Sequence, residues 1–214
     1  MSPKPNHAVG ASPHEADAAR PLRSDARRNR QKLVEVARDA FARAGEPIAL
    51  ENIAREAGVG IGTLYRHFPT RESLIEEVYA AELDDVVRKA DTVLAHASPE
   101  VALIAWMEHY AGFVAAKRGL AEPLRAGLNT GTIVTASTRQ RITGAVEKIL
   151  SAGRTAGVLR HDVRADDLTA MLLGVFLATA AEGDSEQTMR LLQLVVDAVR
   201  IHHPGPSGVG RPNT

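Results

Sequence analysis

The sequence predicts an all-α protein in which a small three-helix domain precedes a larger helical domain. Apolar residues recur at intervals of three and four through most of the 214 residues, which is the spacing of one helical face. We find no convincing period-two strand and no internal repeat in the sequence. Because 44% of the residues are hydrophobic, the chain can bury a sizeable core.

Composition narrows the environment in which the chain works. It has no cysteine, which excludes disulfides, thiolate metal sites and cysteine nucleophiles and fits a cytoplasmic location. The longest apolar run, residues 168–181, has 14 residues, fewer than the roughly 20 that a membrane span needs, so we expect no membrane partner. Residues 1–24 lack an apolar block of signal-peptide length and predict a disordered arm, and residues 202–214, rich in Pro and Gly, predict a disordered tail.

Charge is balanced over the whole chain but not along it. The 26 basic and 26 acidic residues give a formal net charge of +0. Residues 20–71 hold 11 Lys and Arg against 6 Asp and Glu, whereas residues 81–200 hold 13 against 15. The basic excess therefore lies in the N-terminal domain, where it would suit contact with phosphates.

The first helix is predicted over residues 25–44 and a second, shorter one over residues 50–57. Gly45 and Pro47 end the first, since glycine suits a left-handed C-terminal position and proline cannot continue a helix. One face of the first helix follows the i, i+3, i+4, i+7, i+8 spacing: Leu33, Val36, Ala37, Ala40 and Phe41.

A glycine-rich bend separates the second helix from a crowded third segment. Gly58 permits the turn, Val59 can fill the space between the two helices, and Gly60 can serve as N-cap. In the third segment, residues 61–68, Leu64 and Phe68 lie four apart and face inward together.

Pro69 ends the third segment, and the remaining chain is predicted to be helical. Thr70 is the expected N-cap of a long helix that joins the two domains, with Ser73 behind it. Beyond Ser98 the helical spacing continues with glycine-bearing breaks. These later helices are expected over residues 98–119, 120–128, 134–156, 166–181 and 185–201.

The first three helices have the parts of a helix-turn-helix, in which the second helix of the motif lies in the major groove of DNA. Gly62 has no side chain and lets the backbone approach a phosphate or a base edge. Arg66 can reach base edges or phosphate, and a helix N-terminus attracts phosphate by itself. Hydroxyl and imidazole donors for phosphates come from Thr63, Tyr65 and His67. Residues 25–80 are therefore predicted to bind double-stranded DNA.

The run ALENIAREAGVGIGTLYRHFPTRESLIEEVY, preceded by the helix KLVEVARDAFARAG, closely resembles the DNA-binding domain of TetR-family transcriptional repressors. The sequence departs from the family's usual pattern at two positions. Ala49 stands where the family usually has a capping Ser or Thr, and Gly60 replaces a common serine at the start of the recognition helix. The resemblance also implies roles for ten residues. Thr63, Tyr65 and His67 would contact phosphates, Ile61, Gly62 and Arg66 would face bases beyond the N-cap Gly60, Arg71 would hold the DNA backbone, and Arg27 and Arg28 would form a basic arm.

The same resemblance implies that residues 81–201 dimerise and bind a small effector. The last two helices are apolar on more than one face, which fits either a dimer interface or an internal core helix. We predict homodimerisation through Leu168, Met171, Leu172, Val175, Leu192, Val195, Val196 and Val199. Residues 110–179 are also similar to C-terminal domains grouped as SbtR-like, on the stretches GLAEPLRAGLNTG and GRTAGVLRHDVRADDL.

An aromatic cluster in the larger domain is the expected effector pocket, with plain core as the alternative reading. The only tryptophan, Trp106, lies within about two helical turns of Met107, Tyr110 and Phe113. A pocket in a helical bundle is usually apolar with a few polar groups, which matches this composition. The predicted pocket residues are Trp106, Met107, Tyr110, Phe113 and Phe176.

An enzyme and an architectural DNA-binding protein are the two alternatives to a ligand-responsive regulator. An enzyme would need converging acid-base groups, but Glu108 and His109 are adjacent and point about 100° apart on a helix, while His161 and Asp162 fall in an expected loop. No catalytic, cofactor or metal site is predicted. An architectural DNA binder would not need a second domain of roughly 120 residues. The prediction is a homodimeric regulator, a repressor in preference to an activator, bound to a palindromic operator.

Overall fold

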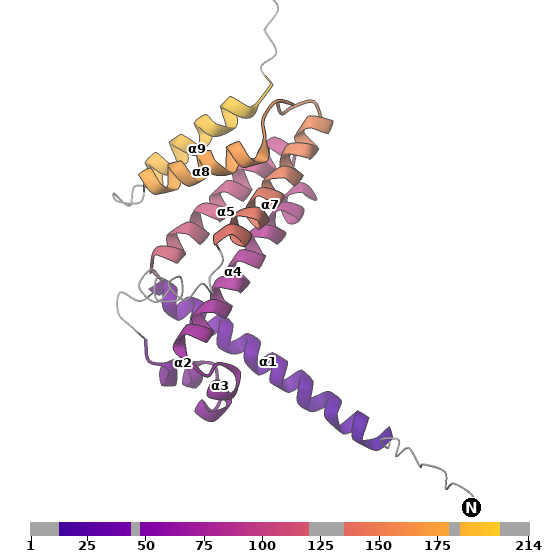
Figure 1. The fold of residues 1–214 in the computed structure, drawn as a ribbon, viewed down its shortest axis with the longest axis vertical. Helices are drawn as coiled ribbons and strands as arrows, with labels where there is room; N and C mark the ends of the chain where they lie inside the picture. The colour runs from indigo at the N-terminus through magenta and orange to yellow at the C-terminus, as the bar shows by residue number, and fades with distance from the viewer. Residues whose placement is uncertain (1–12, 44–47, 120–134, 180–184, 202–214) are drawn as a thin grey trace, which may run out of the picture. The chain divides into compact units, whose positions relative to one another are not determined.

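The computed structural model describes residues 13–43, 48–119, 135–179 and 185–201, and nearly all of these are helical (Figure 1). The described residues contain no β-strand, and their one strand-like pairing is an isolated bridge between Leu159 and Arg200. The predicted all-α class is therefore confirmed. The predicted helix 120–128 and tail 202–214 lie outside the described residues. The helices are α1 (Pro13–Arg43), α2 (Leu50–Glu56), α3 (Ile61–His67), α4 (Arg71–Leu94), α5 (Pro99–Gly119), α7 (Thr135–Thr155), α8 (Ala165–Ala178) and α9 (Ser185–Val199).

The helix α1 begins at Pro13, twelve residues before the expected start at residue 25. The sequence predicted a disordered arm over residues 1–24, because this segment has three prolines before Asp17 and no apolar block of signal-peptide length. Residues 13–24 nevertheless hold three Ala, two Arg and one Glu, which are good helix formers and continue a helix already formed by residues 25–43, in spite of Pro21. This part of the arm is therefore corrected to helix, and residues 1–12 lie outside the described residues.

The chain divides into two compact units, Met1–Val78 and Tyr79–Thr214. In the first unit, α1, α2 and α3 pack on one another, with the first turns of α4 contributing to the same unit. Its core consists of fully buried apolar side chains at helical spacing, which keep the short helices α2 and α3 in place. They include Leu33, Ala37, Phe41, Ile53, Leu64, Phe68, Leu74 and Val78.

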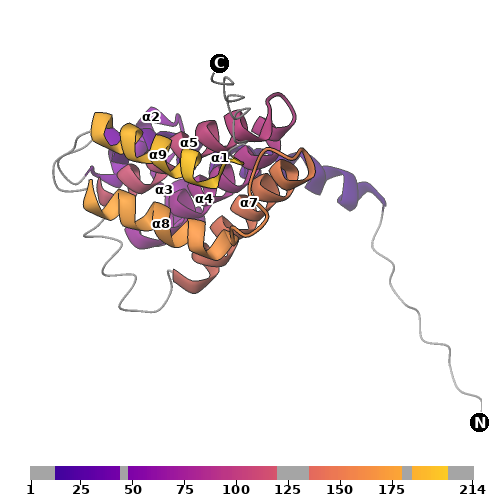
Figure 2. The ribbon, with the colours of Figure 1, turned by 90° about the horizontal axis from the view of Figure 1, so that it is seen from above.

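In the second unit, α7 packs on α5 and α8, and α9 packs on α5 and α8. Figures 1 and 2 both show α8 and α9 lying side by side. Trp106 on α5 is completely buried, and its indole Nε1 donates a hydrogen bond of 2.9 Å to the carbonyl of Val86 on α4. That bond satisfies the one polar group of the ring, so the largest side chain of the unit fixes α5 on α4.

The end of α7 turns the chain back toward α9. Gly157 has a φ of 69°, and the amide of Val158 bonds the carbonyl of Gly153 at 3.0 Å, which is the hydrogen bonding of a Schellman C-cap. The fully buried Leu159 then lies on Gly153, where a Cβ atom would come within 2.3 Å of its Cδ1 atom. Glycine at this position lets the connection between α7 and α8 pack closely on α7.

No helix in the described part of the chain is long and apolar enough to cross a membrane.

Candidate nucleic-acid interface

The turn between α2 and α3 has the geometry that the glycines predict. Gly58 has a φ of 66°, its amide bonds the carbonyl of Arg55 at 3.1 Å, and the amide of Val59 bonds the carbonyl of Ala54 at 2.9 Å. This is a Schellman C-cap, in which the left-handed position favours glycine. Val59 is buried behind the turn, as expected. The turn therefore sets the direction in which α3 leaves α2.

The helix α3 buries one side and exposes the other. Gly60 is its N-cap with extended backbone angles, and Leu64 and Phe68 are almost completely buried. Two large side chains on the other side stay exposed, Ile61 at 40% and Tyr65 at 44%. Ile61 and Tyr65 lie four residues apart, so they share one exposed side of this seven-residue helix.

Arg66 is exposed and lies along its own helix. Its Nε atom donates to the carbonyl of Gly62 at 3.2 Å, and its Nη2 atom donates to the hydroxyl of Thr63 at 3.0 Å. Both bonds hold the guanidinium over the first turn of α3, beside the position that has no side chain. His67 is half-buried and its ring centre lies 6.3 Å from that of Phe68. The structure thus gathers the predicted residues 60–67 on one short helix.

The start of α4 is a reciprocal cap. The hydroxyl of Thr70 accepts a bond of 3.1 Å from the amide of Ser73, and the hydroxyl of Ser73 accepts one of 3.2 Å from the amide of Thr70. This arrangement satisfies two backbone donors and begins the helix sharply after Pro69. The predicted N-cap at Thr70 is confirmed.

The three predicted DNA-binding arginines outside α3 differ in their exposure to solvent. Arg27 and Arg28 are exposed and project from the helix α1. The Nη1 atom of Arg28 lies 3.5 Å from the Oδ1 atom of Asp25. Arg71 is half-buried: it donates to the carbonyl of Ile48, and its guanidinium carbon lies 5.6 Å from the ring centre of Phe41. The side chain expected to hold the DNA backbone is thus engaged inside the first unit.

Sequence reasoning missed the role of Arg30 in supporting the interface. Its guanidinium pairs with Glu77 on α4 and lies 5.1 Å from the ring centre of Phe68 at the end of α3. The hydrogen bond to Glu77 raises the pKa of Arg30. The partners are 47 residues apart in sequence, and no local pattern marks them as a pair. This contact connects α1, α3 and α4.

Comparisons with known proteins agree with this geometry. Residues 33–78 match the family described as bacterial regulatory proteins of the tetR family, and residues 98–201 match the SbtR-like C-terminal domain of transcriptional regulators. The crystal structure of the TetR transcriptional regulator SCO0520 from Streptomyces coelicolor is 40% identical, with a TM-score of 0.71 over 80% of this chain and 98% of that one. The chain belongs to the TetR family of transcriptional regulators.

Two further regulators are similar to this chain. A TetR regulatory protein from Mycobacterium vanbaalenii is 32% identical, with a TM-score of 0.67 over 84% of this chain and 99% of its own. An HTH-type transcriptional regulator of Staphylococcus aureus strain USA300 is 44% identical over 64 residues, which are 29% of this chain. The match spans only 35% of the length of that curated relative.

In the second unit of this TetR-family regulator, the predicted pocket residues do meet, around Tyr110. Its ring centre lies 5.3 Å from that of Trp106 and 5.2 Å from that of Phe176, which meets it edge-on. Phe113 is 6.1 Å away, and Met107 is buried on the same helix. Burial raises the pKa of Tyr110 to about 12, so the phenol stays neutral. The four aromatic residues form one buried cluster, and Met107 is buried on the same helix as three of them.

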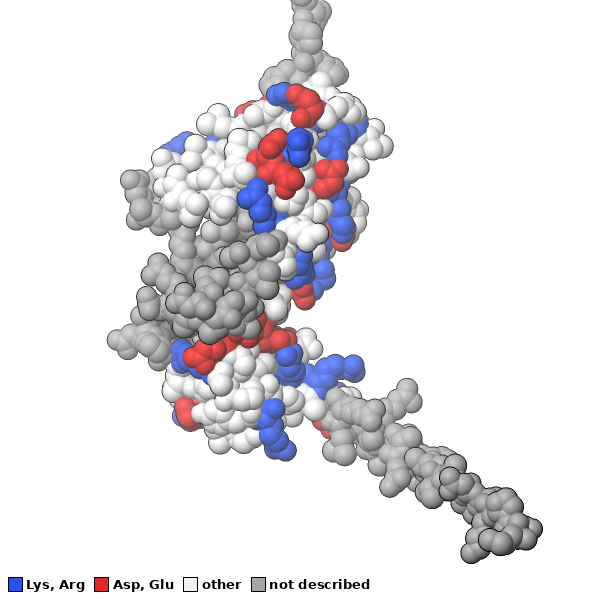
Figure 3. All heavy atoms as spheres, in the orientation of Figure 1, with Lys and Arg blue, Asp and Glu red and all other residues white. Residues whose placement is uncertain are grey.

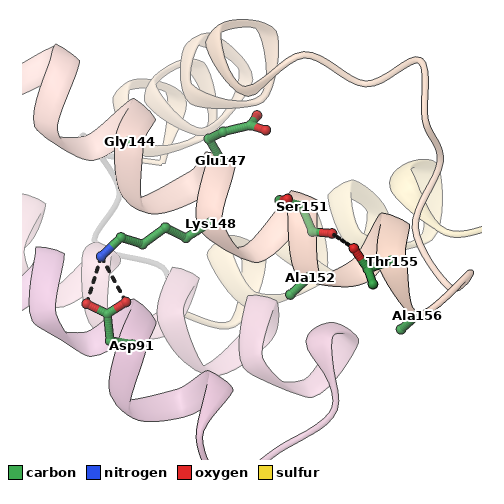
Figure 4. Close-up of a pocket in the computed structure, with 8 residues that line it drawn as sticks. All are labelled: Asp91, Gly144, Glu147, Lys148, Ser151, Ala152, Thr155 and Ala156. Atoms are coloured by element: carbon green, nitrogen blue, oxygen red, sulfur yellow. Dashed lines mark hydrogen bonds and ion pairs between the residues drawn. The ribbon is translucent and has the colours of Figure 1, made fainter.

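Two open grooves lie elsewhere on this unit, along α7. The larger, of about 860 Å³, is lined by Gly144, Ser151 and Thr155 among others, with Asp91 of α4 opposite (Figure 4). Lys148 reaches across it, and its Nζ atom bonds both carboxylate oxygens of Asp91 at 2.7 and 2.8 Å. A second groove of about 530 Å³ shares the exposed Gly144. Neither groove is lined by the aromatic cluster.

The predicted dimerisation residues lie mostly inside the single chain. Six of the eight predicted side chains are buried in the core of the single chain, and Val175 is half-buried. Met171 alone is well exposed, at 43%. Helical spacing identified the apolar faces of α8 and α9 but could not separate the face that packs inside the chain from the face that looks outward. The buried six are Leu168, Leu172, Leu192, Val195, Val196 and Val199.

The outward apolar surface of α8 and α9 consists instead of five large side chains. Leu177 is 66% exposed and Leu194 is 63% exposed, which is high for leucine. Figure 3 shows this part of the second unit with few charged side chains. We call these five residues together the outer apolar face, in which Leu173 and Leu177 lie four apart on one side of α8: Met171, Leu173, Leu177, Met189 and Leu194.

The groups considered for an enzyme lie in two places: Glu108 and His109 on α5, and His161 and Asp162 in the connection between α7 and α8. Glu108 is exposed, whereas the Nε2 atom of His109 lies 3.0 Å from Asp85. Asp162 is paired with Arg160, and that hydrogen bond lowers the pKa of the carboxyl. Within the described ranges, no three His, Asp or Glu side chains are grouped as a metal ion would require.

Proposed function

We propose that this TetR-family regulator is a ligand-responsive repressor that binds a palindromic operator as a homodimer, in the cytoplasm where the chromosome lies. The observation that carries the proposal is the two-sided helix α3. Leu64 and Phe68 fix it on the first unit, while Ile61, Tyr65 and Arg66 are left exposed on the other side. A short helix with this distribution can enter a major groove and present its side chains to bases and phosphates.

The outer apolar face supports the homodimer. Leu177 on α8 and Leu194 on α9 would remain in water in a single chain, and covering them with the same face of a second chain removes that cost. A two-fold interface uses the same patch on both subunits, and a two-fold dimer binds a palindrome. The two copies of α3 would then lie roughly 34 to 36 Å apart, one helical turn of DNA.

The buried aromatic cluster supports an effector that is small and largely apolar. Tyr110 would supply a neutral hydroxyl among the rings, so a ligand with one hydrogen-bonding group would fit such a site. Entry of the ligand requires the rings to separate, which would favour a different conformation of the second unit. The affinity for DNA would fall by the difference in ligand binding energy between the two conformations.

The first test is fluorescence anisotropy with the intergenic DNA beside the gene, at two salt concentrations. We expect tight, salt-dependent binding, weakened by Tyr65→Ala on every sequence, whereas Arg66→Ala also changes the preference among sites. Arg88→Ala is the matched control, because Arg88 is also an exposed helical arginine but lies on the second unit. Equal loss of binding in all three variants, or no preference over random DNA in a genome-wide selection, would contradict a sequence-specific reader.

The dimer is tested by sedimentation of Leu177→Glu and Leu194→Glu. Each substitution introduces a carboxylate that would lose its water in a two-fold interface. Both variants should therefore shift to monomer while their helical content stays unchanged. Val101→Glu is the control, since Val101 is 55% exposed on α5 and lies outside the outer apolar face. A monomeric wild type, or a dimer that both substitutions leave intact, would exclude this interface.

A further inference from the structure

The helix α2 begins without the side-chain cap that a short helix normally has. Its N-cap is Ala49, which has extended backbone angles and makes no side-chain hydrogen bond. The first turn relies on the carbonyl of Ala49, which accepts from the amides of Asn52 and Ile53. A helix of seven residues gains little from propensity alone, so its start must be held by contacts from elsewhere in the unit.

Arg71 makes the contact that holds this start. Its Nη1 atom donates to the carbonyl of Ile48, the residue that precedes the N-cap, across 23 positions of sequence. Its guanidinium also lies over the ring of Phe41, 5.6 Å from the centre. Phe41 is buried on α1, so one side chain connects α4, α1 and the segment that enters α2.

We propose that Arg71 is a positioning residue for the DNA reader and makes no phosphate contact of its own. By holding Ile48, it fixes the N-terminal end of α2, and the turn at Gly58 transmits that orientation to α3. The inference rests on the proposed function, because it assigns the orientation of the operator-binding helix to this contact.

The geometry favours positioning over phosphate binding. The guanidinium of Arg71 is held by two contacts inside the first unit, a carbonyl and the face of an aromatic ring, and the side chain is half-buried. A phosphate contact by Arg71 would have to use the donors that Ile48 leaves over while the side chain stays half-buried, whereas the side chains of Arg27 and Arg28 are exposed. Lysine could supply charge to a phosphate at this position, but it has no planar group to stack on Phe41 while it donates to Ile48.

Hydrogen exchange tests the contact without DNA. In the full chain, Arg71→Ala and Arg71→Lys should speed exchange of the amides of Asn52 and Ile53 by about tenfold or more. Exchange of α1 amides near Leu33 should be unchanged, which separates a local release from general destabilisation of the unit. Unchanged exchange at Asn52 and Ile53 in both variants would overturn the proposal.

The salt dependence of operator binding tests the role. Loss of a positioning residue should lower affinity about tenfold at every salt concentration, leaving the slope of log affinity against log salt as in wild type. A lost phosphate contact lowers the slope by about 0.9 per contact, which is the result expected for the control Arg27→Ala. A reduced slope in Arg71→Ala, with affinity restored by Arg71→Lys, would overturn the proposal. If the wild type has no operator, the proposed function fails, and the exchange experiment still decides whether Arg71 holds α2.

Discussion

Gly62→Ala should make the protein more stable and a poorer DNA binder. Gly62 lies in the first turn of α3, is exposed, and does not have a positive φ, so its backbone conformation suits any residue. A Cβ atom added there meets nothing within 4 Å. The fold of the single chain therefore gives no reason for glycine at this position.

The expected magnitudes follow from that open space. Glycine inside a helix costs about 0.5–1 kcal/mol relative to alanine, and Gly62→Ala should recover that amount in the free energy of unfolding of the first unit. If the backbone of Gly62 approaches a phosphate or a base edge, a methyl group would push it away. Loss of one hydrogen bond to a charged group costs about 1.5–3 kcal/mol, which is roughly a tenfold loss of affinity or more.

The assay pairs urea unfolding with anisotropy on the operator, and the chain offers a matched control. Gly144 is also an exposed helical glycine with nothing within 4 Å of an added Cβ, but it lies on α7 in the second unit. Gly144→Ala should raise stability by about the same amount and leave DNA affinity unchanged. Wild-type affinity in Gly62→Ala, or an equal loss in both variants, would refute the reasoning that DNA approaches α3 at Gly62.

Three further predictions concern the supporting structure. Gly153→Ala should destabilise the second unit by about 1–3 kcal/mol in urea unfolding, because the new Cβ would lie 2.3 Å from Leu159; a gain like that expected at Gly144 would contradict this packing. Tyr110 has a folded pKa of about 12, above its ordinary value of 10.0, so its contribution to stability is complete below about pH 10 and declines up to about pH 12. Tyr110→Phe should flatten that decline in the free energy of unfolding against pH, and an unchanged decline would mean that other groups cause it. Thr70→Ala should cost the first unit about 1 kcal/mol in thermal unfolding, whereas no loss would show that Ser73 caps α4 alone.

Much of the first unit could be predicted because its signals are local. The turn at Gly58, the N-caps at Gly60 and Thr70 and the inward pair Leu64 and Phe68 each depend on residues within one or two helical turns. The resemblance to the TetR family added roles for the exposed residues of α3, and the comparisons confirm the family.

The dimerisation residues were harder to predict for a physical reason. Leu172 and Leu177 are both apolar residues of α8, yet one is fully buried and the other is 66% exposed. Helical spacing reports that a face is apolar, but burial depends on which neighbouring helix covers it, and that is a property of the packed unit.

The sequence by itself determined the helical class, the order of the helices, the turn and the residues that α3 presents, because spacing, caps and glycines act over a few residues. Only the tertiary structure decided that Arg71 holds Ile48, that Arg30 pairs with Glu77, and that Leu159 lies on Gly153. Arg71 and Arg30 contact residues far away in the chain, and the contact of Leu159 depends on how the loop folds back on α7. Contacts of this kind form only when the elements pack, so no local pattern of residue types encodes them.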